Sequence, residues 1–279
     1  MSAVYDWLSM LPFGFTQTAF MQRAFIAVVL SSIMFGMIGT LAVDNNMAFF
    51  SDALGHSAAT GIAIGIILGV KNELIALIAF GILMALLINR VRSGGAASTD
   101  TIISVFSSTA LAVGLLLLSK TRSSAQYSAY LIGDILSVSE SEIVLLVFAL
   151  IVVVAIWCIC YNKFLLIAIN KSLAASRGIK VVLFENVFSC LIAVVVMLSI
   201  KWVGILLINS MLILPAAAAR NVARGVRSYN LLSIIFATFS GIAGLIFSWY
   251  LGTAAGAMIV MISAVIFFST FTIRAVTHK

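Results

Sequence analysis

The sequence predicts an all-α membrane protein, a polytopic helical bundle of eight or nine transmembrane helices in a single domain over residues 1–279. Hydrophobic residues make up 63% of the chain and charged residues 9%, and the mean hydropathy is +1.23. A soluble domain typically carries about 25% charged residues, so this chain has too few to cover a surface in water. In lipid, only helices and closed barrels satisfy every backbone polar group. The long apolar runs do not alternate with polar residues, which favours helices over a barrel.

Nine apolar stretches, each close to the roughly 20 residues that cross the hydrocarbon core, are expected to be helices. They are residues 22–43, 52–70, 73–91, 101–119, 142–161, 182–200, 203–219, 231–250 and 254–274. The residues before the first stretch have no basic start, so we interpret them as an interfacial segment rather than a cleavable signal peptide. The junction Leu251-Gly252-Thr253 is short for a turn, which leaves a count of eight open.

Small residues recur within the first two stretches. Ser32, Gly36 and Gly39 lie on or near one face of the first helix, and Gly61, Gly65 and Gly69 recur every four residues on the second. Small residues at this spacing let transmembrane helices approach closely. We therefore expect these positions to be helix contacts within the bundle.

The basic residues predict the orientation of the chain in the membrane. With the amino terminus outside, eleven of the sixteen Lys and Arg residues fall inside and five outside. The inside residues are Arg90, Arg92, Lys163, Lys171, Arg177, Lys180, Arg220, Arg224, Arg227, Arg274 and Lys279, and the outside residues are Arg23, Lys71, Lys120, Arg122 and Lys201. The positive-inside rule then places the amino terminus on the outer side and the carboxyl terminus on the inner side of the membrane. We expect that membrane to be a bacterial-type plasma (inner) membrane. This distribution also accounts for the net charge of +7 without a nucleic-acid partner.

The longest inside connection, residues 162–180, contains Lys171-Ser-Leu-Ala-Ala-Ser-Arg177-Gly178. This stretch predicts a short amphiphilic helix that a glycine terminates. The sequence shows no soluble domain, no low-complexity tail and no clear internal repeat.

Asp52 and His56 are the candidate metal ligands. They lie four residues apart at the start of the second predicted helix, and positions i and i+4 share a helix face. A carboxylate and an imidazole can together hold a divalent cation, and ionisable groups in membrane spans are usually functional. The alternative is that Asp52 caps the helix and His56 forms a hydrogen bond to a neighbouring helix. The spacing does not choose between the two.

Asp100 follows Ser98 and Thr99 and is expected to cap the fourth helix. It faces the same side of the membrane as Asp52, so a supporting role near the metal is an alternative. The other histidine, His278, lies at the carboxyl end and is expected to be solvated. The sequence therefore predicts an open site with two ligands, which suits transit because binding must allow release.

The sequence contains no Gly-x-x-x-x-Gly-Lys-Ser/Thr phosphate loop. It also contains no nucleophile elbow, zinc-protease motif or kinase signature. We expect the chain not to be an enzyme, and any ATP that powers it must be hydrolysed by another subunit.

Several stretches together resemble the permeases of ABC transporters that take up zinc, manganese or iron. Residues 49–61 read Phe-Phe-Ser-Asp-Ala-Leu-Gly-His-Ser-Ala-Ala-Thr-Gly and resemble the signature of that family, roughly Gly-Asp-x-x-x-His followed by small residues and a glycine. Further matches are residues 98–101, 133–139, 204–220 and 256–260. The matches follow the family's order over roughly residues 30–265. Ser51 stands where the family usually has glycine, and Asp44-Asn45-Asn46 stands where it often has arginine.

This resemblance implies a type II importer permease that acts as a homodimer. Two cytosolic ABC ATPase subunits would bind ATP, and an extracytoplasmic metal-binding protein would deliver zinc or manganese, with iron as a further candidate. No covalently bound cofactor is implied. The family's acid and histidine carry over onto Asp52 and His56. The family's coupling helix, which contacts the ATPase, carries over onto Leu173, Ala174, Ala175, Ser176, Arg177 and Gly178.

The alternative class is an ion-coupled secondary metal transporter or channel. Such proteins often show inverted repeats and charges buried at the middle of the membrane on broken helices. This sequence shows no clear repeat and almost no charges within its spans. The ABC permease is therefore the favoured interpretation.

Overall fold

The computed structural model describes residues 18–70, 72–95, 97–121, 130–131 and 133–277. The basic residues Lys71, Arg122 and Lys279 and the carboxyl-terminal His278 lie outside this described part. Its helices are α2 (Ala19–Asp44), α3 (Phe50–Ile67), α4 (Glu73–Ser93), α5 (Thr99–Thr121), α7 (Glu140–Ile169), α8 (Lys171–Ser176), α9 (Val181–Val203), α10 (Ile205–Val222), α11 (Val226–Leu251) and α12 (Ala255–Thr277), with a 3-10 turn η2 (Ile135–Ser137).

All nine predicted apolar stretches are helical. Within the described part, eight helices are long and apolar enough to cross a membrane. The ninth, α10, has a shorter apolar stretch, contains Pro215 and begins directly after α9. Gly204 separates these two helices and adopts φ +87°, a conformation that glycine tolerates without steric cost. The Leu251-Gly252-Thr253 junction is a real break, since Gly252 ends α11 in the left-handed conformation.

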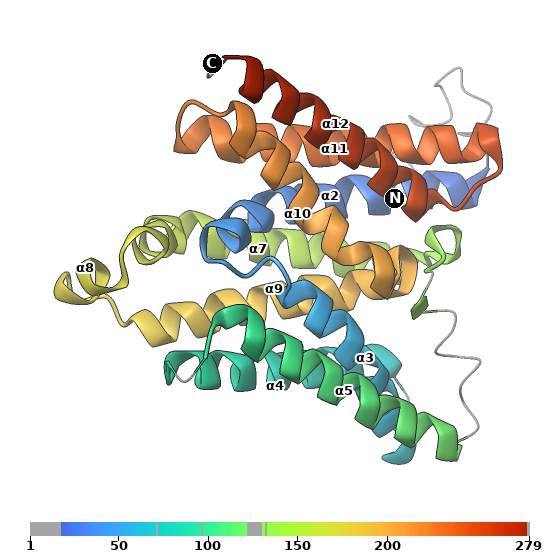
Figure 1. The fold of residues 1–279 in the computed structure, drawn as a ribbon. Helices are drawn as coiled ribbons and strands as arrows, with labels where there is room; N and C mark the ends of the chain where they lie inside the picture. Colours follow the sequence, from blue (N-terminus) through green and yellow to red (C-terminus); the bar gives the residue numbers. More distant parts are fainter. Residues whose placement is uncertain (1–17, 71, 96, 122–129, 132, 278–279) are drawn as a thin grey trace.

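One predicted boundary is wrong. The expected loop over 162–180 is mostly helical, because α7 continues to Ile169 and Asn170 alone separates it from α8. The two polar residues Asn162 and Lys163 do not end the helix, because its apolar pattern resumes at Phe164. Phe164 then packs against Phe184 of α9. The predicted short helix is present as α8, at one extreme end of the bundle (Figure 1).

The helices pack as two groups. One consists of α2, α10, α11 and α12, and the other of α3, α4, α5 and α9. Helix α7 contacts α2 and α9, and α3 also packs against α10 and α9, so the groups are joined along their length (Figure 1).

Small residues allow the closest contacts, as the sequence predicts. A Cβ added at Gly36 of α2 would lie 2.7 Å from the Cα of Ile234 on α11, and one at Gly65 of α3 would lie 2.7 Å from the Cβ of Ala76 on α4. Gly39 makes a comparable approach to the backbone of Leu212 on α10. These separations leave no room for a side chain, so glycine sets the spacing of α2 from α10 and α11 and that of α3 from α4. Gly69 is not such a contact, because it lies beyond the end of α3 and a Cβ on it would meet no atom within 4 Å.

Candidate functional site

Helix α3 begins well inside the bundle. A short connection follows the end of α2, and α3 then starts part of the way along the length of α9 (Figure 1). Its first turns pack against those of α10, where a Cβ on Gly55 would meet the Ile205 side chain at 3.1 Å. The beginning of α3 therefore places polar groups among helices rather than at the end of the bundle.

Asp52 and His56 face each other across one turn of α3. The Asp52 Oδ2 and His56 Nε2 atoms are 3.7 Å apart, and 40% and 25% of the two side chains are exposed. This separation is too long for a hydrogen bond. Two ligands that each lie ~2.1 Å from a cation and 3.7 Å from each other subtend an angle of about 120° at the cation. The pair is thus spaced so that one ion can bridge it.

The structure does not support the capping alternative for Asp52. Helix α3 begins at Phe50, its N-cap is Phe49, and no side chain forms a cap hydrogen bond. Asp52 is instead inside the first turn, where a negative charge interacts favourably with the helix dipole. Within the described residues the His56 Nδ1 atom is buried without a hydrogen-bond partner, so the proposed hydrogen bond to another helix is absent there.

Ser51 and Asn209 form a polar contact beside this pair. The fully buried Ser51 hydroxyl donates a 2.6 Å hydrogen bond to Asn209 Oδ1 of α10. Sequence reasoning noted Ser51 only as an exception to the family pattern and did not single out Asn209. An amide in an otherwise apolar helix was the available signal, but its partner lies 158 residues away in the chain.

Asp100 does not join the pair. It is exposed in the first turn of α5, and among the described residues no group of three or more His, Cys, Asp and Glu side chains could hold a metal. The capping prediction for Asp100 is also wrong, because the hydroxyl of Ser98 accepts the Thr101 N–H at 3.3 Å. Within the described residues of one protomer, no third carboxylate, imidazole or thiolate therefore accompanies Asp52 and His56.

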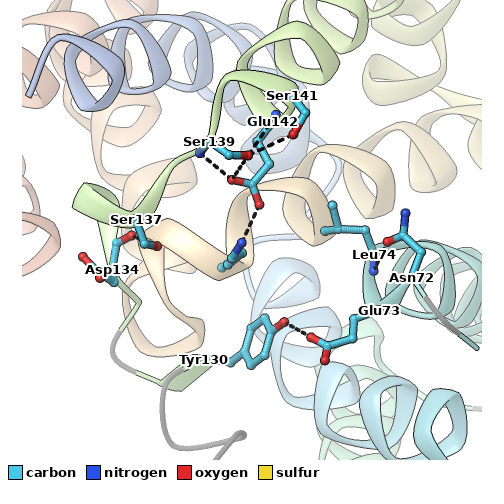
Figure 2. Close-up of polar contacts among 10 residues, drawn as sticks. Asn72, Glu73, Leu74, Tyr130, Asp134, Ser137, Ser139, Ser141 and Glu142 are labelled. Atoms are coloured by element: carbon cyan, nitrogen blue, oxygen red, sulfur yellow. Dashed lines mark hydrogen bonds and ion pairs between the residues drawn. The ribbon is translucent and has the colours of Figure 1, made fainter. Parts of the chain in front are cut away.

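A second set of polar contacts lies where α7 begins and α9 ends, at the end of the bundle opposite α8 (Figure 1), and Figure 2 shows its side chains. The Lys201 Nζ atom contacts Glu142 Oε1 at 2.6 Å, and Ser139 donates to Glu142 Oε2 through its N–H at 2.8 Å and its hydroxyl at 2.9 Å. Glu142 lies in the first turn of α7 and forms an ion pair to α9 in addition to its hydrogen bonds from Ser139. This ion pair, which sequence reasoning missed, holds α7 and α9 together.

Glu73 and Asp134 have local roles at the same end. The Tyr130 hydroxyl donates a 2.6 Å hydrogen bond to Glu73 Oε2, so Glu73 is not simply a solvated charge (Figure 2). Burial and then the Glu73 carboxylate raise the pKa of Tyr130 above its ordinary value. Asp134 Oδ1 accepts the Leu136 N–H at 3.0 Å and so stabilises the 3-10 turn.

Helix α8 presents an exposed surface at its end of the bundle. Asn170 caps it by accepting the Leu173 N–H at 3.0 Å, and Gly178 ends the turn with φ +77°. Ala174 is fully buried, whereas Leu173 is 43% exposed. The predicted segment Leu173–Gly178 is thus the end of a short helix and its turn, anchored at one residue and otherwise open to a partner.

These features define a polytopic membrane protein with an open pair of candidate ligands among its helices and an exposed helix at one end. The model of the ABC 3 transport family matches residues 17–274. The chain belongs to this family, as its motifs predict. It is the membrane permease subunit of an ABC transporter and not the ATPase.

Two named relatives and one solved structure match nearly the whole length of this chain. The manganese import system permease protein ScaB of Streptococcus parasanguinis is 32% identical over 95% of each chain. The high-affinity zinc uptake system membrane protein ZnuB of Haemophilus influenzae is 31% identical over 88% of this chain and 94% of its own. The solved structure of PsaBC from Streptococcus pneumoniae in complex with Fab matches with a TM-score of 0.81 and 28% identity, over 97% of this chain and 95% of that chain.

Proposed function

We propose that this permease carries manganese or zinc into the cell as part of an ABC importer. Family membership and the printed functions of ScaB and ZnuB support this assignment. The chain lacks a phosphate loop, so its ATPase is a separate subunit. The secondary-transporter alternative has no comparable support.

The pairing of Asp52 with His56 carries the proposal that the ion passes the beginning of α3. Their 3.7 Å separation suits a shared cation, and both side chains are partly exposed. Imidazole suits zinc and iron, and carboxylate suits manganese as well, so this pair accepts each of the candidate metals. Water or the neighbouring Asn209 and Ser51 oxygens complete the coordination. An ion that has only two protein ligands from this pair, and whose remaining ligands can exchange, is bound weakly enough for onward release.

We infer the remaining assembly from family membership, and its orientation from the charges of the chain. We place the amino terminus outside and the α8 end inside, in a bacterial-type plasma membrane, because this orientation puts most Lys and Arg residues inside. Leu173–Gly178 then docks against a cytosolic ABC ATPase. The permease acts as a homodimer with two such ATPases, and an extracytoplasmic metal-binding protein delivers the ion to the opposite end.

Metal uptake by the reconstituted permease with its ATPase and binding protein tests the site. We expect Asp52→Asn and His56→Gln each to lower the uptake of labelled manganese or zinc by about tenfold or more, while the complex with the ATPase still assembles. Asp100→Asn is the matched control, because Asp100 is also an acid in the first turn of a helix but does not lie in the pair. Wild-type uptake by the double variant Asp52→Asn/His56→Gln would show that the ion takes another path.

The same system tests the docking surface and the metal. Leu173→Asp should abolish ATPase binding, because a charge replaces an exposed apolar side chain on α8. Retained ATPase binding in this variant would contradict the docking assignment. Competition between manganese and zinc for uptake identifies the preferred metal.

A further inference from the structure

Glu185 is a buried carboxylate that contacts two cations from different helices. Its Oε1 atom lies 3.0 Å from Arg92 Nη2 and 2.7 Å from Lys171 Nζ. The side chains of Glu185 and Arg92 are 7% and 8% exposed, whereas that of Lys171 is 58% exposed. Buried charges of this kind are retained only when they are paired. Sequence reasoning assigned Arg92 and Lys171 only to topology and did not consider Glu185.

This cluster joins three elements at the α8 end of the bundle. Arg92 is in the last turn of α4, Glu185 is near the beginning of α9, and Lys171 is the first residue of α8. A second contact, the 2.7 Å hydrogen bond from Asn89 Nδ2 to Asn186 Oδ1, also links α4 to α9. Helices α4 and α9 are therefore held together twice, and Lys171 attaches α8 to this pair.

The cluster also borders a pocket that it shares with the connection leading into α3. Asn45 and Met47 line the same narrow pocket as Arg92 and Glu185. Met47 is buried, and its carbonyl accepts the N–H of Phe50, the first residue of α3, at 3.0 Å. Ion pairs thus join α8 through Glu185 to Arg92, and Arg92 lines one pocket with the connection that leads into the helix carrying Asp52 and His56.

We propose that Glu185 is the positioning residue through which α8 controls the beginning of α3. When the ATPase displaces α8, Lys171 transfers the displacement to Glu185 and hence to the α4–α9 pair. The connection over Asn45 and Met47 then shifts with Arg92. This inference rests on the proposed docking of α8 against the ATPase.

Lys171→Met tests the link with little risk to folding, because Lys171 is more than half exposed and the Glu185–Arg92 pair remains. In the reconstituted complex we expect wild-type ATPase binding and near wild-type ATP hydrolysis, with metal transported per ATP reduced about fivefold. Lys171→Arg should restore the ratio, because it keeps a cation within reach of Glu185. Lys180→Met is the matched control, since it removes the same charge from an exposed residue of the same connection.

The outcomes distinguish the proposed role of Glu185 from the proposed docking of α8 against the ATPase. An unchanged transport ratio in Lys171→Met, an equal loss in Lys180→Met, or no recovery in Lys171→Arg would overturn the role of Glu185. Loss of ATPase binding in Lys171→Met would also overturn it, because Lys171 would then be a docking residue. Intact ATPase binding by Leu173→Asp would instead refute the docking of α8.

Glu185→Gln provides an independent measurement. It leaves Arg92 without a full charge partner, so its thermal unfolding is recorded first. If it folds, the double variant Lys171→Met/Glu185→Gln should transport no less metal per ATP than Glu185→Gln alone, because both changes interrupt one link. Additive losses would refute the link, and if Glu185→Gln does not fold, the Lys171 series decides the question.

Discussion

Gly114 offers a direct test of how closely α3 is held. This residue of α5 faces α3, and a Cβ placed on it would lie 2.7 Å from the Thr60 backbone nitrogen and 2.8 Å from Ala59 Cβ. Ordinary carbon contacts are ~3.5–4.0 Å. Gly114→Ala must therefore separate α3 and α5 by about 1 Å, because the atoms it meets belong to the backbone and to a short side chain.

The expected cost has three contributions. Overpacking of this kind costs about 1–3 kcal/mol. The separation also strains the hydrogen bond from the Thr60 hydroxyl to the Ala110 carbonyl, which contributes about 0.6–1.7 kcal/mol in a membrane protein. Alanine regains up to ~1 kcal/mol through its higher helix propensity. The net loss of stability should be about 1–3 kcal/mol.

Thermal unfolding in detergent measures this loss, and metal uptake measures the effect on α3. Gly225→Ala is the control, because its Cβ would meet nothing within 4 Å and its backbone is extended. Gly114→Ala should unfold at a lower temperature than both the wild type and Gly225→Ala. If Gly114→Ala and Gly225→Ala unfolded alike, the close approach of α3 and α5 would not be a determinant of stability.

Two further predictions concern the end opposite α8. Lys201→Met should destabilise the protein by about 1–3 kcal/mol in thermal unfolding. This is less than the cost of breaking a fully buried ion pair, because Glu142 keeps its two hydrogen bonds from Ser139. An unchanged unfolding temperature would contradict a stabilising ion pair between Lys201 and Glu142. The pKa of Tyr130 is raised in the folded state. Its contribution to the stability of the folded protein is therefore complete below the unfolded pKa of about 10, and it is lost as the pH rises above that value. Tyr130→Phe should therefore be less stable than the wild type at pH 8, through the lost bond to Glu73. Between about pH 9 and pH 11, Tyr130→Phe should also lose less stability than the wild type loses. Equal losses of stability in the two proteins over this range would refute the raised pKa of Tyr130.

The helices and their order could be predicted from the sequence because burial in lipid requires long apolar runs. All nine predicted stretches are helices, and the short helix before Gly178 is present. The end of α7 could not be predicted, since Asn162 and Lys163 resemble a loop locally. Contact between Phe164 and Phe184 of α9 stabilises the additional turns, and that contact depends on packing.

The candidate site was predictable only where its residues are neighbours in the chain. Asp52 and His56 are four residues apart, so helix geometry alone places them together. Asp100 was a weaker candidate, because the argument for it was only that it faces the same side of the membrane as Asp52. The packing of α5 leaves it exposed and outside the pair. The contact between Ser51 and Asn209 is absent from any local pattern, because its partners are on α3 and α10.

The sequence by itself determined that this protein lies in lipid, the order of its apolar helices, and the spacing of the two candidate ligands on α3. These follow from hydropathy, helix period and spacing, which are local properties. Only the tertiary structure decided which polar groups meet across helices, as Glu185 meets Arg92 and Lys171 and Glu142 meets Lys201. The physical reason is that a buried charge needs a partner, but the choice of partner depends on how the helices pack.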